Sequence, residues 1–232
     1  MSERVNVAFS RIASHYDIMN HLMSMGVDVM WRRRAAEMLM EGMRPGMSYS
    51  VLDAATGTGD LAIMLEEYAE RRSIDMHITA QDFNKEMLSI AVSKAAARRC
   101  RRIRFELGDA MHMHYRSGTF DAVTSAFALR NFDSVYAFSK EAHRVLKRNG
   151  RFAFLDMAMP DTSHGRAFFN AYAVLMKGAG AFIDREAYSW LVRSIKGFDT
   201  NMLKHALLSE GFRNVSISRL ATGIAFVARG LK

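Results

Sequence analysis

The sequence predicts an α/β protein with one mostly parallel, seven-stranded sheet that ends in an antiparallel hairpin. Short apolar, strand-like runs alternate with helical segments of about a dozen residues, and this alternation implies right-handed crossovers between parallel strands. The last two strand-like runs are joined by just two residues, 221–222. That link is too short for a parallel crossover, so these two strands are expected to pair antiparallel.

Each expected element rests on its own hydrophobic pattern. Strands are predicted at residues 48–55, 75–82, 102–109, 120–128, 151–158, 214–220 and 223–229. Helices, with apolar positions at helical spacing, are predicted at residues 61–72, 85–99, 134–147 and 200–211. A turn is expected at Asn149 and Gly150, directly before the fifth strand. Residues 160–198 stand outside this alternation and are interpreted as an insertion.

Composition indicates one compact domain and excludes several classes of protein. Half of the 232 residues are hydrophobic, which is enough for a sizeable core. The single cysteine, Cys100, excludes an internal disulfide and a zinc site made of cysteines. The N-terminal residues carry charges, and no apolar run reaches the roughly 18 residues of a membrane-spanning helix. We therefore expect a cytoplasmic protein.

Much of the formal charge of +8 lies in two arginine-rich runs, residues 31–34 and 98–104. Positive charge attracts anionic partners such as nucleic acid, an acidic membrane surface or a phosphorylated metabolite. The simpler interpretation is that both runs are solvated helix ends, where cations favour the negative end of the helix dipole. Contact with RNA or with an anionic membrane is the alternative.

The stretch VLDAATGTGD, residues 51–60, indicates a ligand-binding turn after the first strand. Gly57 and Gly59 let the backbone approach a ligand closely, and the following helix offers amide groups at its N-terminus. In a dinucleotide site those amides face a pyrophosphate, which Asp60 would repel. Asp60 and Asp53 together suit a cation, such as an amino group or a sulfonium, better than a phosphate.

Two further acids follow the next strands of the expected sheet. Asp82 stands 23 residues after Gly59, at a strand end from which a carboxylate can accept both hydroxyls of a ribose. Asp109 and Ala110 end the third strand beside the same crevice, where an adenine fits. Each aspartate alone is as easily explained as a helix cap, but acids at three strand ends favour one shared ligand. A ribose, an adenine and a positively charged tail together describe S-adenosylmethionine.

These motifs resemble the ubiquinone/menaquinone biosynthesis C-methyltransferases, a family of S-adenosylmethionine-dependent enzymes. The likeness runs nearly end to end and includes YDIMN (16–20), VLDAATGTGD, GDA (108–110), FALRNF (127–132) and TGIAFVARG (222–230). Most methyltransferases of this fold share the glycine turn, whereas YDIMN together with LRN is much narrower. The resemblance implies the Rossmann-like methyltransferase fold and a lipophilic polyprenyl quinol, such as demethylmenaquinol, as the methyl acceptor.

The resemblance also assigns cofactor contacts. The family's own contacts fall on Thr58, Asp82, Asp109 and Ala110, and a further family contact, usually a serine, falls on Ala126. With the glycine turn included, the expected S-adenosylmethionine-binding residues are Asp53, Gly57, Thr58, Gly59, Asp82, Phe83, Asp109, Ala110 and Ala126.

Three departures from the family pattern loosen the interpretation of the substrate. The family's S-F-G-L-R-N reads A-F-A-L-R-N here, with Ala126 and Ala128 in place of the serine and the glycine, so one hydrogen bond to the cofactor is lost. Asp156 stands where the family usually has a glutamate in L-E-F-S-x-P. The stretch MHMHY, residues 111–115, replaces a leucine-proline-phenylalanine segment.

Methyl transfer to a ring carbon requires particular partners. The displacement gains from alignment and from exclusion of water, and the carbon becomes nucleophilic when an adjacent quinol hydroxyl loses its proton. Arg130 and Asn131 follow the fourth strand at the crevice and are predicted to bind the oxyanion and orient the acceptor; a structural ion pair is the alternative for Arg130. Asp60 is predicted to hold Arg130 or to relay the proton. Tyr16 is predicted to close the site from an N-terminal helical lid.

The chain is predicted to form a single methyltransferase domain with four parts. Residues 1–45 form the lid, 46–158 the cofactor-binding core, 160–198 a helical insertion on the substrate side, and 199–232 the C-terminal helix and hairpin. The insertion is expected to line a channel for an isoprenoid tail, with ordinary helix packing as the alternative. The side chains concerned are Phe168, Phe169, Tyr172, Leu175 and Met176.

No metal is expected, because a sulfonium is already activated, and His112 and His114 alone do not complete a metal site. Two other functions stay open. One is an RNA-binding methyltransferase or a cofactor-binding RNA partner, which the lack of an appended RNA-binding module disfavours. The other is methylation of a different small molecule. A lipid-tailed substrate would also bring the protein into peripheral contact with an anionic membrane.

Overall fold

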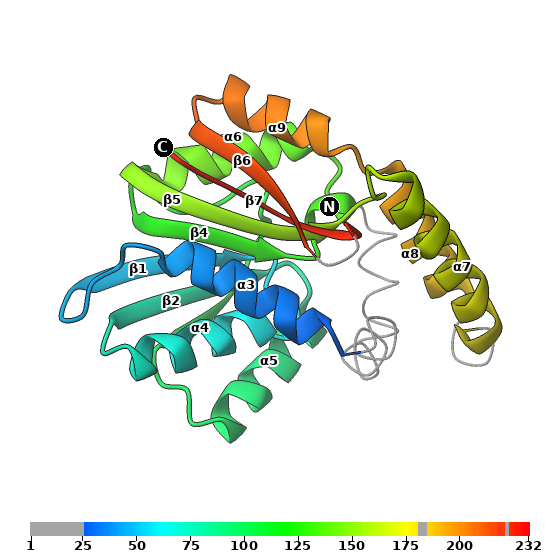
Figure 1. Cartoon of the computed structure of the whole chain (residues 1–232). Helices are drawn as coiled ribbons and strands as arrows, with labels where there is room; N and C mark the ends of the chain where they lie inside the picture. Colours follow the sequence, from blue (N-terminus) through cyan, green and yellow to red (C-terminus); the bar gives the residue numbers. More distant parts are fainter. Residues whose placement is uncertain (1–25, 181–184, 221–222) are drawn as a thin grey trace.

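The computed structural model describes residues 26–180, 185–220 and 223–232, which form a seven-stranded sheet covered by helices on both faces (Figure 1). The strand order is β3-β2-β1-β4-β5-β7-β6. The strands are β1 (Ser48–Ala54), β2 (Asp75–Asp82), β3 (Ile103–Leu107), β4 (Phe120–Ala126), β5 (Leu146–Met157), β6 (Arg213–Leu220) and β7 (Ala225–Leu231). The first five pair in parallel, and β7 runs antiparallel to both β5 and β6. The predicted class, the parallel sheet and the C-terminal hairpin are confirmed.

The helices divide between the two faces of the sheet. They are α3 (Asp28–Met40), α4 (Asp60–Arg71), α5 (Lys85–Ala97), the 3-10 helix η2 (Leu129–Asn131), α6 (Val135–Val145), α7 (Ser163–Gly180), α8 (Arg185–Gly197) and α9 (Thr200–Ser209). Helices α3, α4 and α5 cover one face, and α6 and α9 cover the other (Figure 1). This layering leaves the carboxyl ends of the parallel strands accessible, which is where ligands bind in such sheets.

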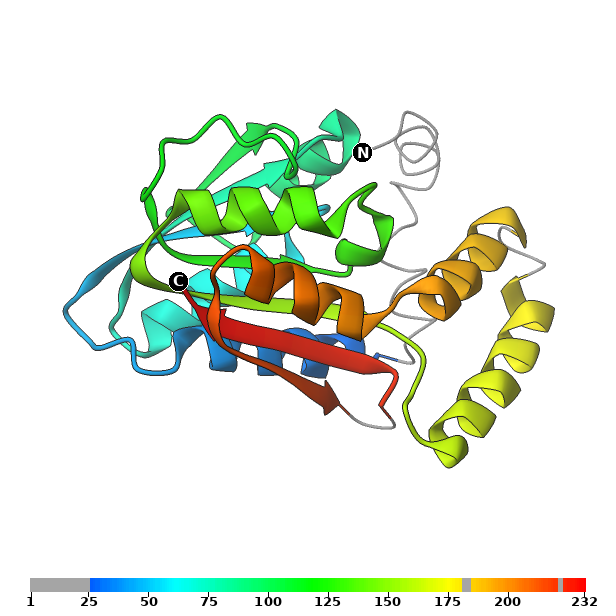
Figure 2. The same cartoon turned by 90° about the horizontal axis from the view of Figure 1, so that it is seen from above.

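Helices α7 and α8 fill most of the predicted insertion and pack against each other. They stand beside the end of the sheet to which the parallel strands point, away from the other helices (Figures 1 and 2). Phe169 of α7 is buried against Ile195 of α8 and Ile224, so this pair of helices is tied to the hairpin by a small core of its own. Within the described ranges, no helix combines the length and apolar character needed to cross a bilayer.

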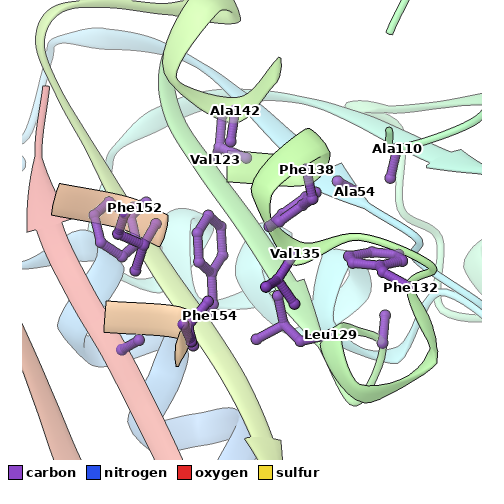
Figure 3. Close-up of a cluster of buried hydrophobic side chains, with 14 of the residues drawn as sticks. Ala54, Ala110, Val123, Leu129, Phe132, Val135, Phe138, Ala142, Phe152 and Phe154 are labelled. Carbon is purple, nitrogen blue, oxygen red and sulfur yellow. The ribbon is translucent and has the colours of Figure 1, made fainter. Parts of the chain in front are cut away.

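Two apolar cores lie on the two faces of the sheet. Against α6 and α9, Phe138 packs edge-on to Phe154 with ring centroids 5.0 Å apart, and Phe152 stacks on Phe154 at 4.6 Å (Figure 3). Against α3 and α4, Val51 and Leu65 are among fully buried side chains. The central strands β1 and β4 are covered on both faces, so residues that point to either face are buried along most of their length.

The expected turn at Asn149 and Gly150 is wrong. β5 begins at Leu146 and runs through both residues, and its pairing with β4 shifts register between Phe120 and Ala122. Asn149 has a φ of 61°, and a Cβ on Gly150 would come within 2.8 Å of the Lys147 carbonyl oxygen. The Asn-Gly pair therefore makes an irregularity inside one long strand, because a bulge and a turn ask for the same residue types.

Candidate active site

The glycine turn between β1 and α4 has a tightly constrained backbone. Gly59 has a φ of 83°, and a Cβ at this position would meet the Cβ of Ala91 at 3.0 Å. The Thr56 amide donates to the Gln81 carbonyl oxygen at 2.9 Å, and the Gly59 amide donates to the Thr56 carbonyl oxygen at 3.0 Å. Gly59 thus serves both the left-handed conformation and the close approach of α5. The protein's own hydrogen bonds therefore hold the turn against the end of β2, and no ligand is needed for this.

A cleft that is partly open to solvent lies above this turn. It gathers most of the residues that the sequence predicted. They are Asp53, Gly57, Thr58, Asp60, Asp82, Phe83, Ala126 and Asn131. Residues that the sequence did not predict also line it, namely Arg32, Ala55, Thr56, Leu61, Asn84, Met87, Phe127 and Ala128.

Asp82 ties the end of β2 to the glycine turn. Its Oδ2 accepts the Gly57 amide at 2.7 Å and its Oδ1 accepts the Asn84 amide at 2.9 Å. Burial raises the pKa of Asp82 to about 6, because the charged form loses its hydration. Each carboxylate oxygen has room for a further donor, so Asp82 can still accept hydroxyl groups from the cleft.

Two buried acceptor atoms on the cleft wall have no hydrogen-bond partner among the described residues, Asp53 Oδ1 and Asn131 Oδ1. The other oxygen of Asp53 accepts the Thr56 hydroxyl at 2.6 Å. Burial raises the pKa of Asp53 to about 7. Buried acceptors without partners are costly, so this wall favours a ligand that brings N–H donors or positive charge.

Asp60 does not hold Arg130, and this prediction is wrong. Asp60 forms an ion pair with Lys94 of α5, and its Oδ2 lies 3.5 Å from Arg32 Nη2 of α3. Lys94 Nζ also donates to the Thr58 hydroxyl at 3.2 Å. The carboxylate at the start of α4 is therefore held between cations from two other helices. A role for Asp60 in proton relay stays a prediction.

The partner of Arg130 is Asp156, the aspartate that replaces the family's glutamate. The pair is buried, and Asp156 Oδ2 also accepts the backbone amide of Arg130 at 3.1 Å. Arg130 Nη1 donates further to the Phe127 carbonyl oxygen at 3.1 Å. A structural ion pair is thus present, as the alternative interpretation expected. The Nε atom of Arg130, however, is buried without a partner in the part of the chain that the structure describes.

Phe127 connects the two buried arginines. It has a φ of 60°, a conformation that costs an aromatic residue about 1–2 kcal/mol. Its ring lies 4.9 Å from the guanidinium carbon of Arg32, whereas its carbonyl oxygen accepts from Arg130. The left-handed residue of this segment is therefore Phe127, since Ala128, which replaces the family's glycine, has a φ of −112°. Such strain persists where the surrounding contacts hold it in place.

Several predicted site residues lie elsewhere. Asp109 Oδ1 accepts the Met111 amide at 2.9 Å, and Ala110 is part of the apolar core near Ala54 (Figure 3). Neither Asp109 nor Ala110 lines the cleft as described, so their contact with adenine stays a prediction. Gly59 and Arg130 do not line it either. Tyr16 lies outside the described residues.

The apolar residues of the insertion do not form one surface. Phe169 is buried in the small core between α7 and α8, whereas Phe168 is 46% exposed. Tyr172 is half-buried, and the side chains of Leu175 and Met176 lie outside those described. His112 and His114 are exposed near Asp109 and Glu106, and the described residues hold no cluster of metal-ligating side chains.

Sequence reasoning missed Arg32, Asn84 and Lys94. The run at residues 31–34 is not a solvated helix end throughout, because Trp31 and Arg32 are buried whereas Arg33 and Arg34 are exposed. The spacing of Asp28 and Arg32 at i and i+4 on one helix was the available signal. Asn84 caps α5 by accepting the Met87 amide at 2.9 Å, which is a recognisable capping position.

This fold and this cleft define a Rossmann-like, S-adenosylmethionine-dependent methyltransferase. The sequence pattern of the ubiE/COQ5 methyltransferase family matches residues 1–232, and the chain belongs to this family. S-adenosylmethionine is accordingly its cofactor, as the strand-end acids predicted.

Individual relatives agree with the assignment. The chain is 35% identical over 236 residues to the demethylmenaquinone methyltransferase of Porphyromonas gingivalis, covering 100% of this chain and 94% of that protein. It is 35% identical over 235 residues to the ubiquinone/menaquinone biosynthesis C-methyltransferase UbiE of Rhizobium johnstonii, covering 98% and 88%. A SAM-dependent methyltransferase from Aquifex aeolicus has the same fold, with a TM-score of 0.58, 17% identity and coverage of 85% and 88%.

The cleft fits this cofactor. Asp82 stands where a ribose can donate two hydroxyls, and the unpartnered oxygens of Asp53 and Asn131 match an ammonium group and a neighbouring sulfonium. Asp60 in the first turn of α4 places an acid where a pyrophosphate site would need an unopposed positive helix terminus.

Proposed function

We propose that this protein transfers a methyl group from S-adenosylmethionine to a ring carbon of a polyprenyl quinol such as demethylmenaquinol. The observation that carries the proposal is the buried Nε–H of Arg130, which has no partner among the described residues although Nη1 is bound by Asp156 and the Phe127 carbonyl. A buried donor on a cationic group has unmet bonding capacity. The phenolate oxygen of a quinol is an acceptor of the matching charge.

The position of η2 supports the proposal. Asn131 lines the cofactor cleft, whereas Leu129 and Arg130 line a second, more open hollow, the acceptor hollow. The acceptor hollow is walled largely by apolar and aromatic side chains, among them Phe132, Val135, Tyr136, Phe198 and Met202. We place the quinol ring at η2 and its isoprenoid tail along these walls, because an apolar tail gains by leaving water.

The residues around η2 divide the chemistry between them. Bound S-adenosylmethionine supplies the activated methyl group. Asp156 orients the Arg130 guanidinium, and Arg130 stabilises the quinol oxyanion as its proton leaves. Asn131 orients the acceptor ring from the cofactor side. The Arg130–Asp156 pair is itself shielded from water, which strengthens its electrostatic contacts.

Peripheral contact with an anionic membrane belongs to the same proposal. Phe168 and Val174 on α7 are 46% and 74% exposed, and α7 stands off the body of the molecule (Figure 2). The chain carries a net charge of +8, which favours an anionic surface. Such contact would bring the protein to a substrate whose lipid tail lies in the membrane.

The proposed function is tested by incubating the purified protein with S-adenosylmethionine and a short-tailed demethylmenaquinol under reducing conditions. Mass spectrometry should show one added methyl group on the ring, and cells that lack the protein should accumulate the demethylated quinone. Normal cofactor binding without methylation of the quinol, together with an unchanged quinone pool, would contradict the proposal and favour another small-molecule acceptor.

A further inference from the structure

Arg32 gives the cofactor cleft a positive group on its α3 side. It is 6% exposed, and among the described residues that line the cleft it is the one with a cationic side chain. Its neighbours Arg33 and Arg34 point to solvent and pair with Glu37. The helix therefore turns one arginine of the run inward and leaves the next two outside.

The guanidinium of Arg32 is held from three sides. It forms a buried ion pair with Asp28 one turn earlier, lies 3.5 Å from Asp60 Oδ2, and stacks over the Phe127 ring at 4.9 Å. These contacts fix the plane of the guanidinium at the edge of the cleft. A planar, oriented guanidinium presents paired donors that match a carboxylate.

Stability alone does not explain this arrangement. Taking a charge out of water is expensive, and a buried ion pair adds little net stability compared with apolar packing of the same volume. An apolar residue at position 32 would pack equally well on the buried side of α3. A buried cation on the wall of a ligand cleft is better explained by the ligand.

The contents of the cleft identify which part of the ligand lies near Arg32. Asp82 and Asn84 on β2 and α5 form the ribose side, whereas Arg32, Phe127 and Asn131 lie toward β4 and η2. The methionine end of the cofactor carries an ammonium and a carboxylate. The unpartnered oxygens of Asp53 and Asn131 suit the ammonium and repel the carboxylate.

We infer that Arg32 binds the carboxylate of the cofactor's methionine end, with Asp28 and Asp60 holding its guanidinium in place. The amino-acid group of S-adenosylmethionine is then recognised by charges of both signs, with acceptors on one side and a cation on the other. This inference concerns the cofactor and is independent of which acceptor is methylated.

The test compares two ligands that differ in one group. Decarboxylated S-adenosylmethionine keeps the adenine, ribose, sulfonium and ammonium and lacks only the carboxylate. Calorimetric titration of the wild-type protein should show that S-adenosylmethionine binds about tenfold to a hundredfold more tightly than the decarboxylated ligand. Equal affinities in the wild-type protein would overturn the inference without any substitution.

Substitution then assigns the difference to Arg32. Arg32→Gln should weaken binding of S-adenosylmethionine by about tenfold to a hundredfold and change binding of the decarboxylated ligand by less than about threefold. Arg32→Lys keeps the charge and should recover part of the preference. Thermal melts and the affinity for the decarboxylated ligand show whether each variant is folded.

Two matched control variants distinguish direct binding of the carboxylate by Arg32 from an indirect effect of Arg32 through Asp60. Arg33→Gln removes an exposed arginine next in the chain and should change neither affinity. Lys94→Gln loosens Asp60 without removing a cation that lines the cleft, and should weaken both ligands alike. If Arg32→Gln also weakened both ligands alike, Arg32 would act through Asp60 and the inference would fail. It would fail equally if neither affinity changed.

Discussion

The cofactor cleft and the acceptor hollow share η2, but different kinds of contact build them. In the cleft, carboxylates hold backbone amides and cations at fixed distances, as Asp82 does with Gly57 and Asn84. In the acceptor hollow, apolar side chains from separate segments, such as Phe132 and Phe198, form the walls. Directional hydrogen bonds specify one ligand shape, whereas apolar walls tolerate ligands of several lengths. Proteins with this fold can therefore bind the same cofactor and differ in the methyl acceptor that they bind.

The largest expected effect comes from a substitution in η2, which should lower methyl transfer much more than cofactor binding. Arg130→Ala should lower the rate of methyl transfer by about a hundredfold to a thousandfold, by analogy with loss of one oxyanion donor. Affinity for S-adenosylmethionine should change by less than about tenfold, because Asp53, Thr58 and Asp82 remain. Single-turnover transfer to a short-tailed demethylmenaquinol and calorimetry measure the two quantities.

A double variant distinguishes a structural role of Arg130, as the partner of Asp156, from a role in methyl transfer. Removing Arg130 alone leaves the buried Asp156 charge unpaired, which should lower the free energy of unfolding by about 3–5 kcal/mol. Arg130→Ala combined with Asp156→Asn removes that charge and should recover much of the stability without recovering transfer. Recovery of both would mean that Arg130 only braces η2.

The next effect belongs to the cleft alone. Asp82→Ala should weaken S-adenosylmethionine binding by about tenfold to a hundredfold, because two ribose hydroxyls lose a charged acceptor worth about 1.5–3 kcal/mol. At saturating cofactor, transfer should be much less affected. Calorimetry on a variant shown to be folded by circular dichroism measures the loss, and unchanged affinity would remove Asp82 from the cofactor site.

Stability and cofactor affinity should both depend on pH through two acids of the cleft. The pKa values of Asp53 and Asp82 are raised to about 7 and about 6, so both groups bind protons more tightly in the folded protein than in the unfolded chain. Their contribution to stability is present at low pH and is lost as pH rises through 6 and 7. A cationic ligand favours the ionised acids, so its affinity should rise at least about tenfold from pH 5.5 to 7.5. Calorimetry in buffers of different ionisation enthalpy should show proton release, and flat affinity would contradict this.

The smallest effect should be confined to the acceptor hollow. Met202→Gln places a polar group on its wall at a position that is 39% exposed, so folding should tolerate it. KM for a long-tailed quinol should rise about threefold to tenfold, in line with the loss of one partly buried apolar group. KM for a short-tailed quinol and affinity for the cofactor should not change. A rise for both quinols would place the tail elsewhere.

The same comparison explains what the sequence could predict. The glycine turn, Asp53 and Asp82 belong to strand ends and turns, where short patterns determine the local backbone. Arg130 and Asp156 are 26 residues apart and meet because β4 pairs with β5 in a register that puts Ala126 beside Leu155. That register, set partly by the irregularity at Asn149, is a property of the sheet and has no local signal.

Arg32 shows a second limit. The three consecutive arginines at 32–34 form a cationic run, and a helix places neighbours 100° apart, so a run alone does not tell which member points inward. The inward side of α3 is decided by its packing on β4, β5 and α4, and the i, i+4 spacing of Asp28 and Arg32 is the local signal for it. The acceptor hollow is less predictable still, because its walls come from segments far apart in the chain.

The roles of the two regions can be observed together in a crystal structure of the protein with S-adenosylhomocysteine and a short-tailed demethylmenaquinol bound. We expect the ribose hydroxyls on Asp82 and the quinol ring against η2, with its oxygen within hydrogen-bond distance of Arg130 Nε. A quinol ring bound away from η2, with Arg130 contacting only Asp156 and Phe127, would contradict this expectation.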